Sequence, residues 1–416
     1  MLTELFRQVH SRYSSLPVLG PILDGFAEWL FQQGYCRALV RRHLQAAWHV
    51  DAALQRIGCV SPRDITRKAL SACLPKHAQD DPDLASTLRL LERRLAAEQA
   101  FPVPQPNRKQ GLLTEYGAYL EGVRGLAPAT IAQHLRTGSQ ILDQIHYEED
   151  PARLADLTGS DIETFVRVSG ERVGRKPLQN VVAQLRSFLR FLSGRAQVAP
   201  GLDGQIDTPR VYRGERLPRS LPWRTVQEFL RSIDRTKPLG LRDYAIFLLV
   251  ATYGLRASEV VALKLDDIEW RAGRILVGQP KTAARLVLPL TDAVGQALVD
   301  YLHRARPSLP YREVFLRGRV PAGRLKPTAV TEAFQAWARR SGLTIPFQGP
   351  HCLRHSYAVH LLRQGVPLKT IGDVLGHRSA ESTCVYIRLA VEDLRDVALH
   401  LPAMAETSAV PRQVRL

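Results

Sequence analysis

Apolar residues recur at three- and four-residue spacing through most of the first 200 residues, and no alternating run of apolar and polar positions interrupts them. This period is typical of amphipathic α-helices, whereas a half-buried strand would alternate with a period of two. The pattern therefore predicts two all-helical modules, over residues 1–100 and 107–200.

Two segments lack this period and separate the predicted modules. Residues 101–110, FPVPQPNRKQ, combine three prolines with a basic cluster, and Pro-rich polar segments form stiff linkers. A second segment, rich in Gly, Pro and Arg, predicts an interdomain linker over 201–220. A third module over 221–390 and a tail over 391–416 complete the predicted organisation.

The two helical modules share a spacing of small and polar residues. The first has Gly34, His43 and Leu44, and the second has Gly125, His134 and Leu135 at the same internal spacing. Each continues into an Asp-Ile pair, Asp64-Ile65 and Asp161-Ile162, which is expected to open a further helix. A duplicated module and two ordinary amphipathic helix sets both explain this similarity.

The third module has a different pattern. A mostly apolar helix passes through a glycine turn at Gly254 into a second helix start, RASEVVAL. Short strands are then predicted over 267–270, 274–277 and 285–290, with the turn GQPKTAA placing Lys281 at a hairpin tip. Helices follow to the end. The fold class expected is mainly α with a small antiparallel sheet, which makes the third module an α+β domain.

Charge narrows the choice of partner. The chain of 416 residues holds 57 Lys and Arg against 40 Asp and Glu, a net charge of +17. Such an excess favours a polyanionic partner, most often nucleic acid and less often an anionic membrane surface. No run of eighteen apolar residues is present, so a membrane span is not expected.

The cysteines and the start of the chain bear on location. Cys36, Cys59, Cys73, Cys352 and Cys384 are scattered and form no CxxC pair. They are interpreted as reduced thiols that pack inside a cytoplasmic protein, and not as a zinc ribbon. The start, MLTELFRQVHSRYSS, lacks the apolar stretch of a secretory signal.

Two predicted helices of the second module offer donors to phosphates and base edges. The helix that begins near Pro128 carries Thr130, Gln133, His134, Arg136 and Thr137, and the segment GRKPLQNVVAQLRSFLRFL carries Arg175, Lys176, Arg186 and Arg190. A solvated helix face is the alternative explanation for each helix taken alone.

The stretch HCLRHSYAVHLLRQG, residues 351–365, concentrates three histidines and two arginines in one predicted helix. His351 and His355 have the i, i+4 spacing of a zinc pair. However, the pair lacks the Glu of H-E-x-x-H and encloses Arg354, which would repel a metal cation. The alternative is a set of donors for an anion, and the rest of the third module favours it.

Four motifs in order, TYGLRASEV, PKTAARLVLPL, HCLRHSYA and LGHRSAESTCVY, resemble the signature of the tyrosine recombinase, or phage integrase, family. The resemblance covers residues 216–390 closely, and residues 107–200 are similar to the core-binding domain of that family. It implies six catalytic residues, of which Tyr386 is the nucleophile: Arg256, Lys281, His351, Arg354, His377 and Tyr386. The loop after Lys281 lacks the glycine that often follows this lysine in the family.

The resemblance also implies supporting roles and partners. Glu259 supports the site without reacting, and His355 orients its neighbours. No cofactor or metal is expected, because a phosphotyrosine linkage conserves the energy of the broken ester. Double-stranded DNA is the expected substrate of a site-specific recombinase of a mobile element, acting as a dimer per site and a tetramer on synapsed DNA, with accessory proteins as possible partners.

The chemistry of the six residues is consistent with that activity. Two guanidinium groups suit the non-bridging oxygens of a phosphodiester, and Lys281 suits protonation of the leaving 5′ oxygen. Of the histidines, His351 is favoured as the base, with donation to the phosphate as the other role open to it. A topoisomerase-like enzyme and a DNA-binding protein of the same fold remain alternatives. The resemblance also implies a helix over 389–400 that docks on a neighbouring protomer, and a helix that packs on its own domain is the alternative.

Overall fold

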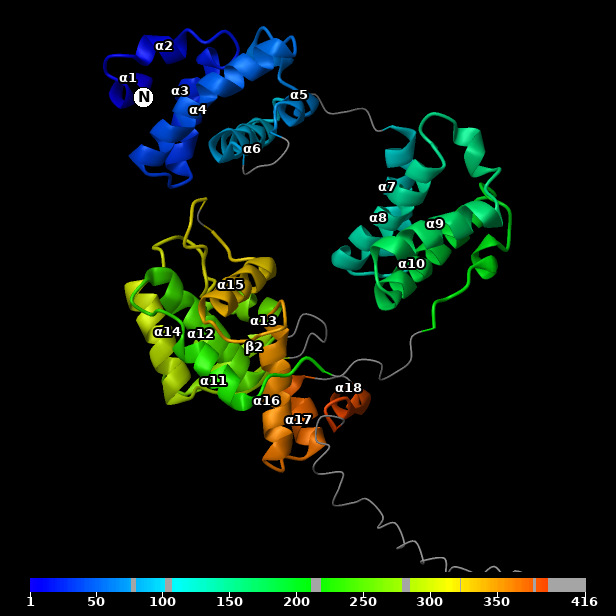
Figure 1. Cartoon of the computed structure of the whole chain (residues 1–416), viewed down its shortest axis with the longest axis vertical. Coiled ribbons are helices and arrows are strands. Elements are labelled where there is room, and N and C mark those ends of the chain that lie inside the picture. The colour runs from blue at the N-terminus through cyan, green and yellow to red at the C-terminus, as the bar shows by residue number, and fades with distance from the viewer. Residues whose placement is uncertain are drawn as a thin grey trace, which may run out of the picture. The chain divides into compact units, whose positions relative to one another are not determined.

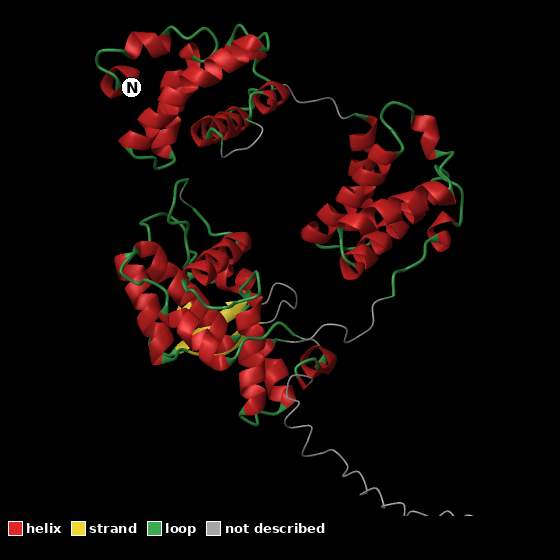
Figure 2. Cartoon of the chain, in the orientation of Figure 1, coloured by secondary structure: helices red, strands yellow, loops and turns green. Residues whose placement is uncertain are grey.

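The computed structural model describes residues 1–75, 80–101, 107–210, 218–278, 285–321, 323–376 and 379–387. Within these ranges the chain is mostly helical and has one small antiparallel sheet (Figures 1 and 2), which confirms the predicted fold class. The contacts divide the chain into two units, one of Met1–Trp48 and Arg216–Leu416 and the other of His49–Glu215.

The N-terminal part of the chain is helical, as predicted. Its elements are α1 (Leu2–Leu5), α2 (His10–Ser14), α3 (Gly20–Gln32), α4 (Arg37–Arg56), the 3₁₀ turn η1 (Pro62–Asp64), α5 (Arg67–Ala72) and α6 (Pro82–Ala97). Helices α1 and α2 pack against α3, and α5 packs against α6. In α3 the residues Leu23, Phe26 and Leu30 are fully buried, at the spacing of three and four that predicted the helix.

The helix start predicted at Asp64-Ile65 is wrong. Asp64 is the last residue of η1, and helix α5 begins only at Arg67. The Asp64 carboxylate accepts the N–H of Ser61 at 2.8 Å, which closes the turn on itself. The corresponding Asp161 does lie in the first turn of a helix. The N-cap residue of that helix is Thr158, which accepts the N–H of Asp161.

Helices α7 to α10 form a bundle with its own core. The elements are α7 (Arg108–Gly122), α8 (Pro128–Gln144), η2 (Pro151–Leu154), α9 (Gly159–Arg172), α10 (Arg175–Ser193) and η3 (Leu202–Gln205). Tyr116 is fully buried between the rings of Phe188 and Phe191, at centroid distances of 4.9 and 5.0 Å. Its hydroxyl donates to Ser187 Oγ at 3.0 Å, so the central polar group of the core is satisfied.

The remaining elements form the domain that carries the candidate site. They are α11 (Trp223–Arg231), α12 (Pro238–Tyr253), α13 (Ala257–Ala262), η4 (Leu265–Asp267), β1 (Ile268–Glu269), β2 (Arg274–Gly278), β3 (Arg285–Pro289), α14 (Asp292–Arg304), α15 (Pro327–Arg340), α16 (His351–Arg363), α17 (Leu368–Leu375) and α18 (Ala380–Cys384). The three strands predicted from the sequence are confirmed within one or two residues at each end.

Helix α12 is the centre of this domain. It packs against α11, α13, α14, α15 and α16, and Figure 1 shows it among them. The helix is apolar on nearly every side, which is the pattern of a helix buried all round. Its one buried ion pair, Arg242 with Asp243 at 2.7 Å, is completed by Trp337 Nε1, which donates to the same carboxylate at 2.9 Å.

The sheet is a meander of order β1-β2-β3 with both pairs antiparallel. Ile275 pairs with Leu288, and both are buried, whereas Val287 on the opposite face is half exposed. The register between β2 and β3 runs on to Gly278 opposite Arg285. One face of the sheet therefore belongs to the core, and the other is partly exposed.

Candidate active site

Helix α12 ends in a tight turn that leads directly into α13. Gly254 adopts a left-handed φ of +65°, and a Cβ at this position would lie 2.4 Å from Cδ2 of Leu375. A larger side chain therefore fits neither the backbone nor the space. Arg256 follows as the N-cap of α13, so the turn brings its side chain to the end of the most buried helix.

Glu259 holds Arg256 in position. The main-chain N–H of Arg256 donates to Oε2 of Glu259 at 2.7 Å, and Nη1 donates to Oε1 at 2.6 Å. The Glu259 side chain is 3% exposed, whereas that of Arg256 retains 29%. The carboxylate therefore fixes the guanidinium and leaves some of its N–H groups open to an anion.

Arg354 is buried between two main-chain carbonyl groups. Its Nη1 donates to the carbonyl of Gly254, and its Nη2 donates to that of Leu375 at 2.6 Å. Burial, followed by the charge of Arg256, lowers the pKa of Arg354 to about 10, so the group stays charged at neutral pH. The two carbonyls engage only part of the five N–H donors of a guanidinium.

His351 opens helix α16, and Arg354 and His355 lie three and four residues further on, so the three side chains share one face. The rings of His351 and His355 meet edge to face with centroids 4.5 Å apart. Packing around the His351 ring lowers its pKa, and the charges of Arg354, Arg256 and Arg219 lower it further. His351 is therefore a neutral imidazole at pH 7.

Tyr386 is a buried phenol in contact with this face of α16. Its Oη lies 2.9 Å from Nδ1 of His355, and only 1% of the residue is exposed. Burial raises the pKa of Tyr386 above its ordinary value, while Arg354 and then Arg256 act to lower it. Tyr386 is thus a protonated phenol at neutral pH, hydrogen-bonded to a histidine and under the influence of two guanidinium groups.

The structure gathers four of the six residues predicted to be catalytic: Arg256, His351, Arg354 and Tyr386. Lys281 and His377 lie outside the described residues. Sequence reasoning gave His355 a general supporting role and did not anticipate its contact with Tyr386. The i, i+4 spacing of His351 and His355 was the available signal, because it placed both rings on the face that Tyr386 contacts.

The base of the β2–β3 hairpin is tied to the end of α12. The hydroxyl of Tyr253 donates to the carbonyl of Pro289 at 2.6 Å, and the N–H of Thr291 donates to the same hydroxyl at 3.2 Å. Tyr253 lies three residues before Arg256. The end of β3, the strand that follows the segment containing Lys281, is therefore tied to a residue that lies close in sequence to Arg256.

Five of the residues predicted to face DNA are exposed on α8 and α10 or just before them: Thr130, Gln133, Arg136, Arg175 and Lys176. Arg190 is exposed as well and pairs with Asp203 at 3.5 Å. These side chains lie on the surface of their bundle, as a DNA-facing set requires.

The others have partners inside the bundle. His134 Nδ1 lies 3.0 Å from Tyr116 Oη, and burial lowers the pKa of His134. Thr137 is buried and donates to Gln184 at 2.7 Å, and Arg186 donates to the carbonyl of Ile206. Their contacts give these three residues a structural role within the bundle.

A metal site is the alternative explanation of the histidines of α16. In the described parts of the chain, no three His, Cys, Asp or Glu side chains come together as a metal centre would need. All five cysteines are free thiols. Across the same residues, none of the helices has the length and apolar character needed to cross a membrane.

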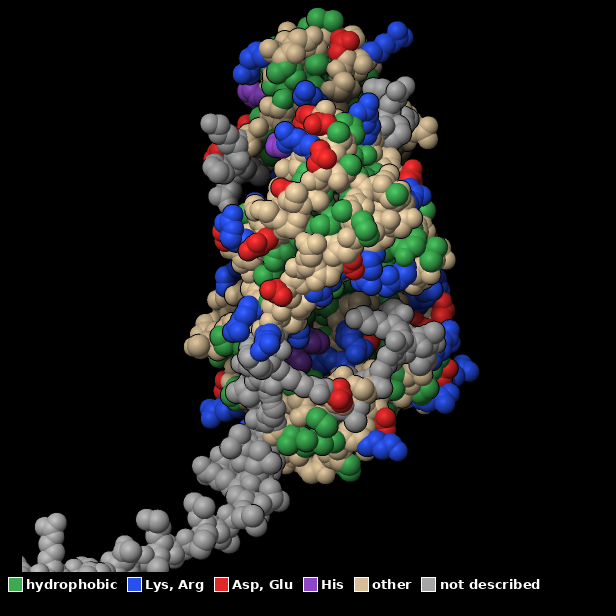
Figure 3. All heavy atoms as spheres, turned by 90° about the vertical axis from the view of Figure 1, so that its right-hand side faces the viewer, with side chains coloured by type: hydrophobic (Ala, Val, Ile, Leu, Met, Phe, Trp, Pro, Cys, Tyr) green, Lys and Arg blue, Asp and Glu red, His purple; other side chains and the backbone are tan. Residues whose placement is uncertain are grey.

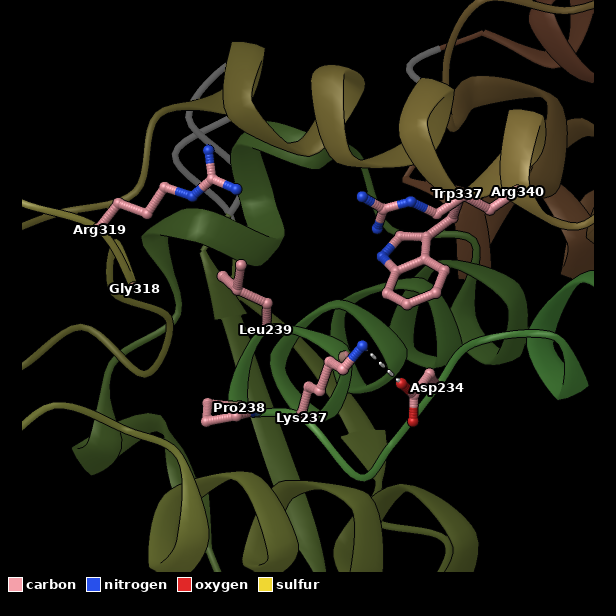
Figure 4. A pocket seen from close by; sticks show the side chains of 9 residues that line it. Asp234, Lys237, Pro238, Leu239, Gly318, Arg319, Trp337 and Arg340 are labelled. Carbon is pink, nitrogen blue, oxygen red and sulfur yellow. Dashed lines mark ion pairs between the residues drawn. The ribbon is translucent and has the colours of Figure 1, made fainter.

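A cavity of about 590 Å³ lies at the opposite end of α12 (Figure 4). It is lined by Lys237, Pro238 and Leu239 at the start of α12 and by Trp337 and Arg340 at the end of α15. Since α12 has 16 residues, its rise of 1.5 Å per residue separates the two ends by roughly 24 Å. This cavity is therefore distinct from the site around Arg256.

The space-filling view adds the distribution of charge. Figure 3 shows Lys, Arg and His side chains close together in the lower part of the view. Such a group of cations suits an anionic ligand.

Comparisons with known proteins agree with this site. Residues 220–393 match the phage integrase family. The chain is 33% identical over 402 residues to a protein of Sinorhizobium fredii described as integrase/recombinase y4rA. The alignment covers 94% of this chain and 97% of that relative. It is 31% identical to tyrosine recombinase XerD of Listeria monocytogenes, over 69% of this chain and 96% of XerD.

Solved structures agree in fold. The XerH site-specific recombinase, in a post-cleavage complex with its palindromic difH substrate, matches with a TM-score of 0.53 at 16% identity, over 71% of this chain and 97% of XerH. At this identity the match concerns the fold alone. The matches in sequence to y4rA and to XerD establish that the chain belongs to the phage integrase family of tyrosine recombinases.

Proposed function

We propose that this recombinase cleaves and rejoins DNA through a 3′-phosphotyrosine intermediate on Tyr386. The observation that carries the proposal is the buried Tyr386 phenol, 2.9 Å from His355 and close enough to Arg354 and Arg256 for both to lower its pKa. A nucleophile, a proton acceptor and two phosphate-binding cations are the parts that phosphodiester transesterification requires.

In the proposed step, the Tyr386 oxygen attacks the scissile phosphorus and its proton passes to a histidine. The bond from phosphorus to the 5′ oxygen breaks, and the leaving oxygen takes a proton from Lys281. Arg256 and Arg354 neutralise the charge on the non-bridging oxygens. Reversal by a 5′ hydroxyl from another strand rejoins the DNA, without ATP or metal.

His355 is the proposed proton acceptor. A general base must lie within hydrogen-bond reach of the proton it takes, and Nδ1 of His355 is 2.9 Å from the Tyr386 oxygen. His351, which is neutral at pH 7 because of its lowered pKa, is then assigned to donate a hydrogen bond to the phosphate. His377, nine residues before Tyr386, is proposed from the sequence motif as a further phosphate ligand.

The proposed function is tested with a nicked suicide substrate, in which the short product diffuses away and traps the intermediate. DNA fragments of the source genome that the protein binds supply the substrate sequences. The expected result is a covalent protein–DNA complex on a denaturing gel, with the DNA attached through its 3′ phosphate. Repeated absence of this complex on DNA that the protein binds would exclude the proposed activity.

Replacing the proton acceptor should slow the chemistry. His355→Gln retains a hydrogen-bonding side chain at Tyr386 but removes the imidazole base, so covalent-complex formation in a single turnover should slow by about 10²-fold or more. DNA binding, measured by gel shift, should remain within about threefold.

His351→Gln is the matched control, because it makes the same substitution four residues earlier. The His351 ring is neutral above its lowered pKa, and Gln imitates a neutral donor. The loss caused by His351→Gln should therefore be constant between about pH 7 and pH 8.5 and should change only in acid, where the wild-type ring gains its proton. A normal rate for His355→Gln would contradict the assignment of the base.

The helical modules are proposed to hold double-stranded DNA. The exposed donors of α8 and α10, together with the net charge of +17, support DNA contact by residues 107–200. The match of 402 residues to y4rA extends into residues 1–100. We therefore propose that recombinases of this kind share the N-terminal module. Integration or transposition of a mobile element is the biological role that we propose, as the name of that relative suggests.

The recombinase is further proposed to act as a dimer on each site and a tetramer on two synapsed sites. The tail is the proposed contact between protomers: Leu394, Val397 and Leu401 follow one another at the spacing of three and four of an amphipathic helix. Truncation after Arg388 should abolish tetramers on DNA, measured by analytical ultracentrifugation, and leave binding to a single site intact. Tetramers that survive the truncation would exclude this contact.

A further inference from the structure

The residues that lead into α11 run alongside helix α16. The N–H of Leu221 donates to Ser356 Oγ at 2.7 Å in a buried hydrogen bond. Two residues later, the indole of Trp223 stacks on His360, with ring centroids 4.2 Å apart and planes within 6° of parallel. The segment is therefore attached to α16 at two points and runs in the same direction as the helix.

These two contacts fix the register between the segment and α16. Between them the segment advances two residues and the helix four, as expected when an extended chain rising about 3.3 Å per residue accompanies a helix rising about 1.5 Å. The same register continued two residues toward the N-terminus places Arg219 beside Cys352 and His351, at the N-terminus of α16.

The local backbone also singles out Arg219. The N–H of Ser220 donates to the carbonyl of Pro218 at 2.9 Å, so Arg219 is the middle residue of a three-residue turn. Its side chain is exposed. A turn at this position directs the side chain away from the segment's own backbone.

The charge of Arg219 acts on the residues that this register predicts. It is one of the three arginines that lower the pKa of His351. It also opposes the rise that burial causes in the pKa of Cys352. The pKa shifts of His351 and Cys352 thus indicate that Arg219 lies near the start of α16. This observation is separate from the contacts of Leu221 and Trp223.

The charge around His351 is out of balance. Three guanidinium groups, those of Arg219, Arg256 and Arg354, influence it. Against them stands the single carboxylate of Glu259, which pairs with Arg256 and also acts on Arg354. Arg219 makes no ion pair with any other residue that the structure describes. The N-terminus of α16, a helix of 13 residues, adds its own partial positive charge. An anion is the group that such a site lacks.

We infer that Arg219, at the end of the interdomain segment, is a third arginine ligand of the scissile phosphate. The inference rests on the proposed function and extends it. Residue 219 lies one position before the part of the chain that matches the family. The segment that joins the DNA-binding module to the catalytic domain then contributes directly to the chemistry, seated by Leu221 and Trp223.

The first experiment tests the location without any catalysis. The full chain, labelled with ¹³C at histidine, is titrated by NMR, and the His351→Gln variant identifies the resonance of His351. Arg219→Ala should raise the midpoint of His351, because it removes a neighbouring positive charge. Arg224→Ala is the matched control, since Arg224 is exposed and paired with Glu228 at 2.9 Å, and it should leave the midpoint unchanged.

The second experiment tests the chemistry. With saturating protein, Arg219→Ala should slow covalent-complex formation by about 10²-fold, while its DNA affinity falls no further than that of Arg224→Ala. Arg219→Lys should recover part of the rate. A substrate with a methylphosphonate at the scissile position carries no charge there, so on this substrate Arg219→Ala and wild type should cleave at similar rates.

The two failures are distinguishable. If wild type forms a covalent complex and Arg219→Ala forms it equally fast, the phosphate contact is excluded and the proposed function stands. An unmoved His351 midpoint in Arg219→Ala excludes the location itself. If wild type forms no complex on DNA that it binds, the proposed function fails, and the role inferred for Arg219 fails with it even where the His351 midpoint moves.

Discussion

Tyr386→Phe is expected to abolish the covalent protein–DNA complex and strand exchange, and to leave DNA binding and folding nearly intact. Phe lacks the oxygen that would bond to phosphorus, so no residual covalent product should form. The substitution keeps the ring that packs with Ile371 and Leu375 in a buried cluster and removes the hydrogen bond to His355. Such a loss typically costs about 1 kcal/mol of the free energy of unfolding.

Tyr357→Phe is the matched control for this prediction. Tyr357 lies on α16 two residues after His355, it packs against the same cluster, and burial raises its pKa as well. It should form the covalent complex at the wild-type rate. The measurement is the yield of complex on the suicide substrate, with mass spectrometry of the DNA-linked peptide. Covalent complex in Tyr386→Phe would reassign the nucleophile.

Arg354→Ala is expected to damage both chemistry and stability. The substitution removes a phosphate ligand, for which a rate loss of about 10² to 10³-fold is typical. It also leaves the buried carbonyls of Gly254 and Leu375 without their donors. Each unsatisfied buried group costs about 1–3 kcal/mol, so the loss of both donors should lower the free energy of unfolding by roughly 2–6 kcal/mol.

Arg256→Ala separates the two effects. Arg256 is partly exposed and is held by Glu259, and it donates to no main-chain carbonyl in the hydrogen bonds of the described residues. Arg256→Ala should lower the cleavage rate by a factor similar to that of Arg354→Ala. It should reduce the free energy of unfolding less than Arg354→Ala does. Denaturant unfolding and single-turnover rates measure both quantities. Equal stability of Arg354→Ala and wild type would show that the carbonyl contacts contribute little.

Much of the fold could be predicted because its signals are local. The apolar period of three and four set the helices, and the short alternating runs with Gly and Pro between them set the sheet. The helix start at Asp64 was predicted wrongly because an aspartate that accepts nearby N–H groups can close a turn as well as cap a helix. Sequence spacing alone does not separate the two.

The candidate site shows the opposite limit. The motifs identified Arg256, His351, Arg354 and Tyr386, but the contacts between them depend on tertiary packing. The i, i+4 spacing places His355 on the same helix face as His351, but it does not indicate that Tyr386, 31 residues away, contacts His355. Nor does a local pattern indicate that Arg354 donates to the carbonyl of Leu375. The place of Arg219 likewise follows only from how its segment packs on α16.

The hydrogen bonds of Arg354 also bear on the stage of synthesis and folding at which the enzyme becomes able to cleave DNA. This guanidinium joins Gly254, 100 residues earlier, to Leu375, 21 residues later, and the nucleophile follows only after that. A nascent chain that ends before Leu375 therefore lacks an assembled phosphate site, even though Arg256, Lys281, His351 and Arg354 have already been synthesised. A chain that has not yet packed its final helices is therefore expected to be unable to cleave DNA.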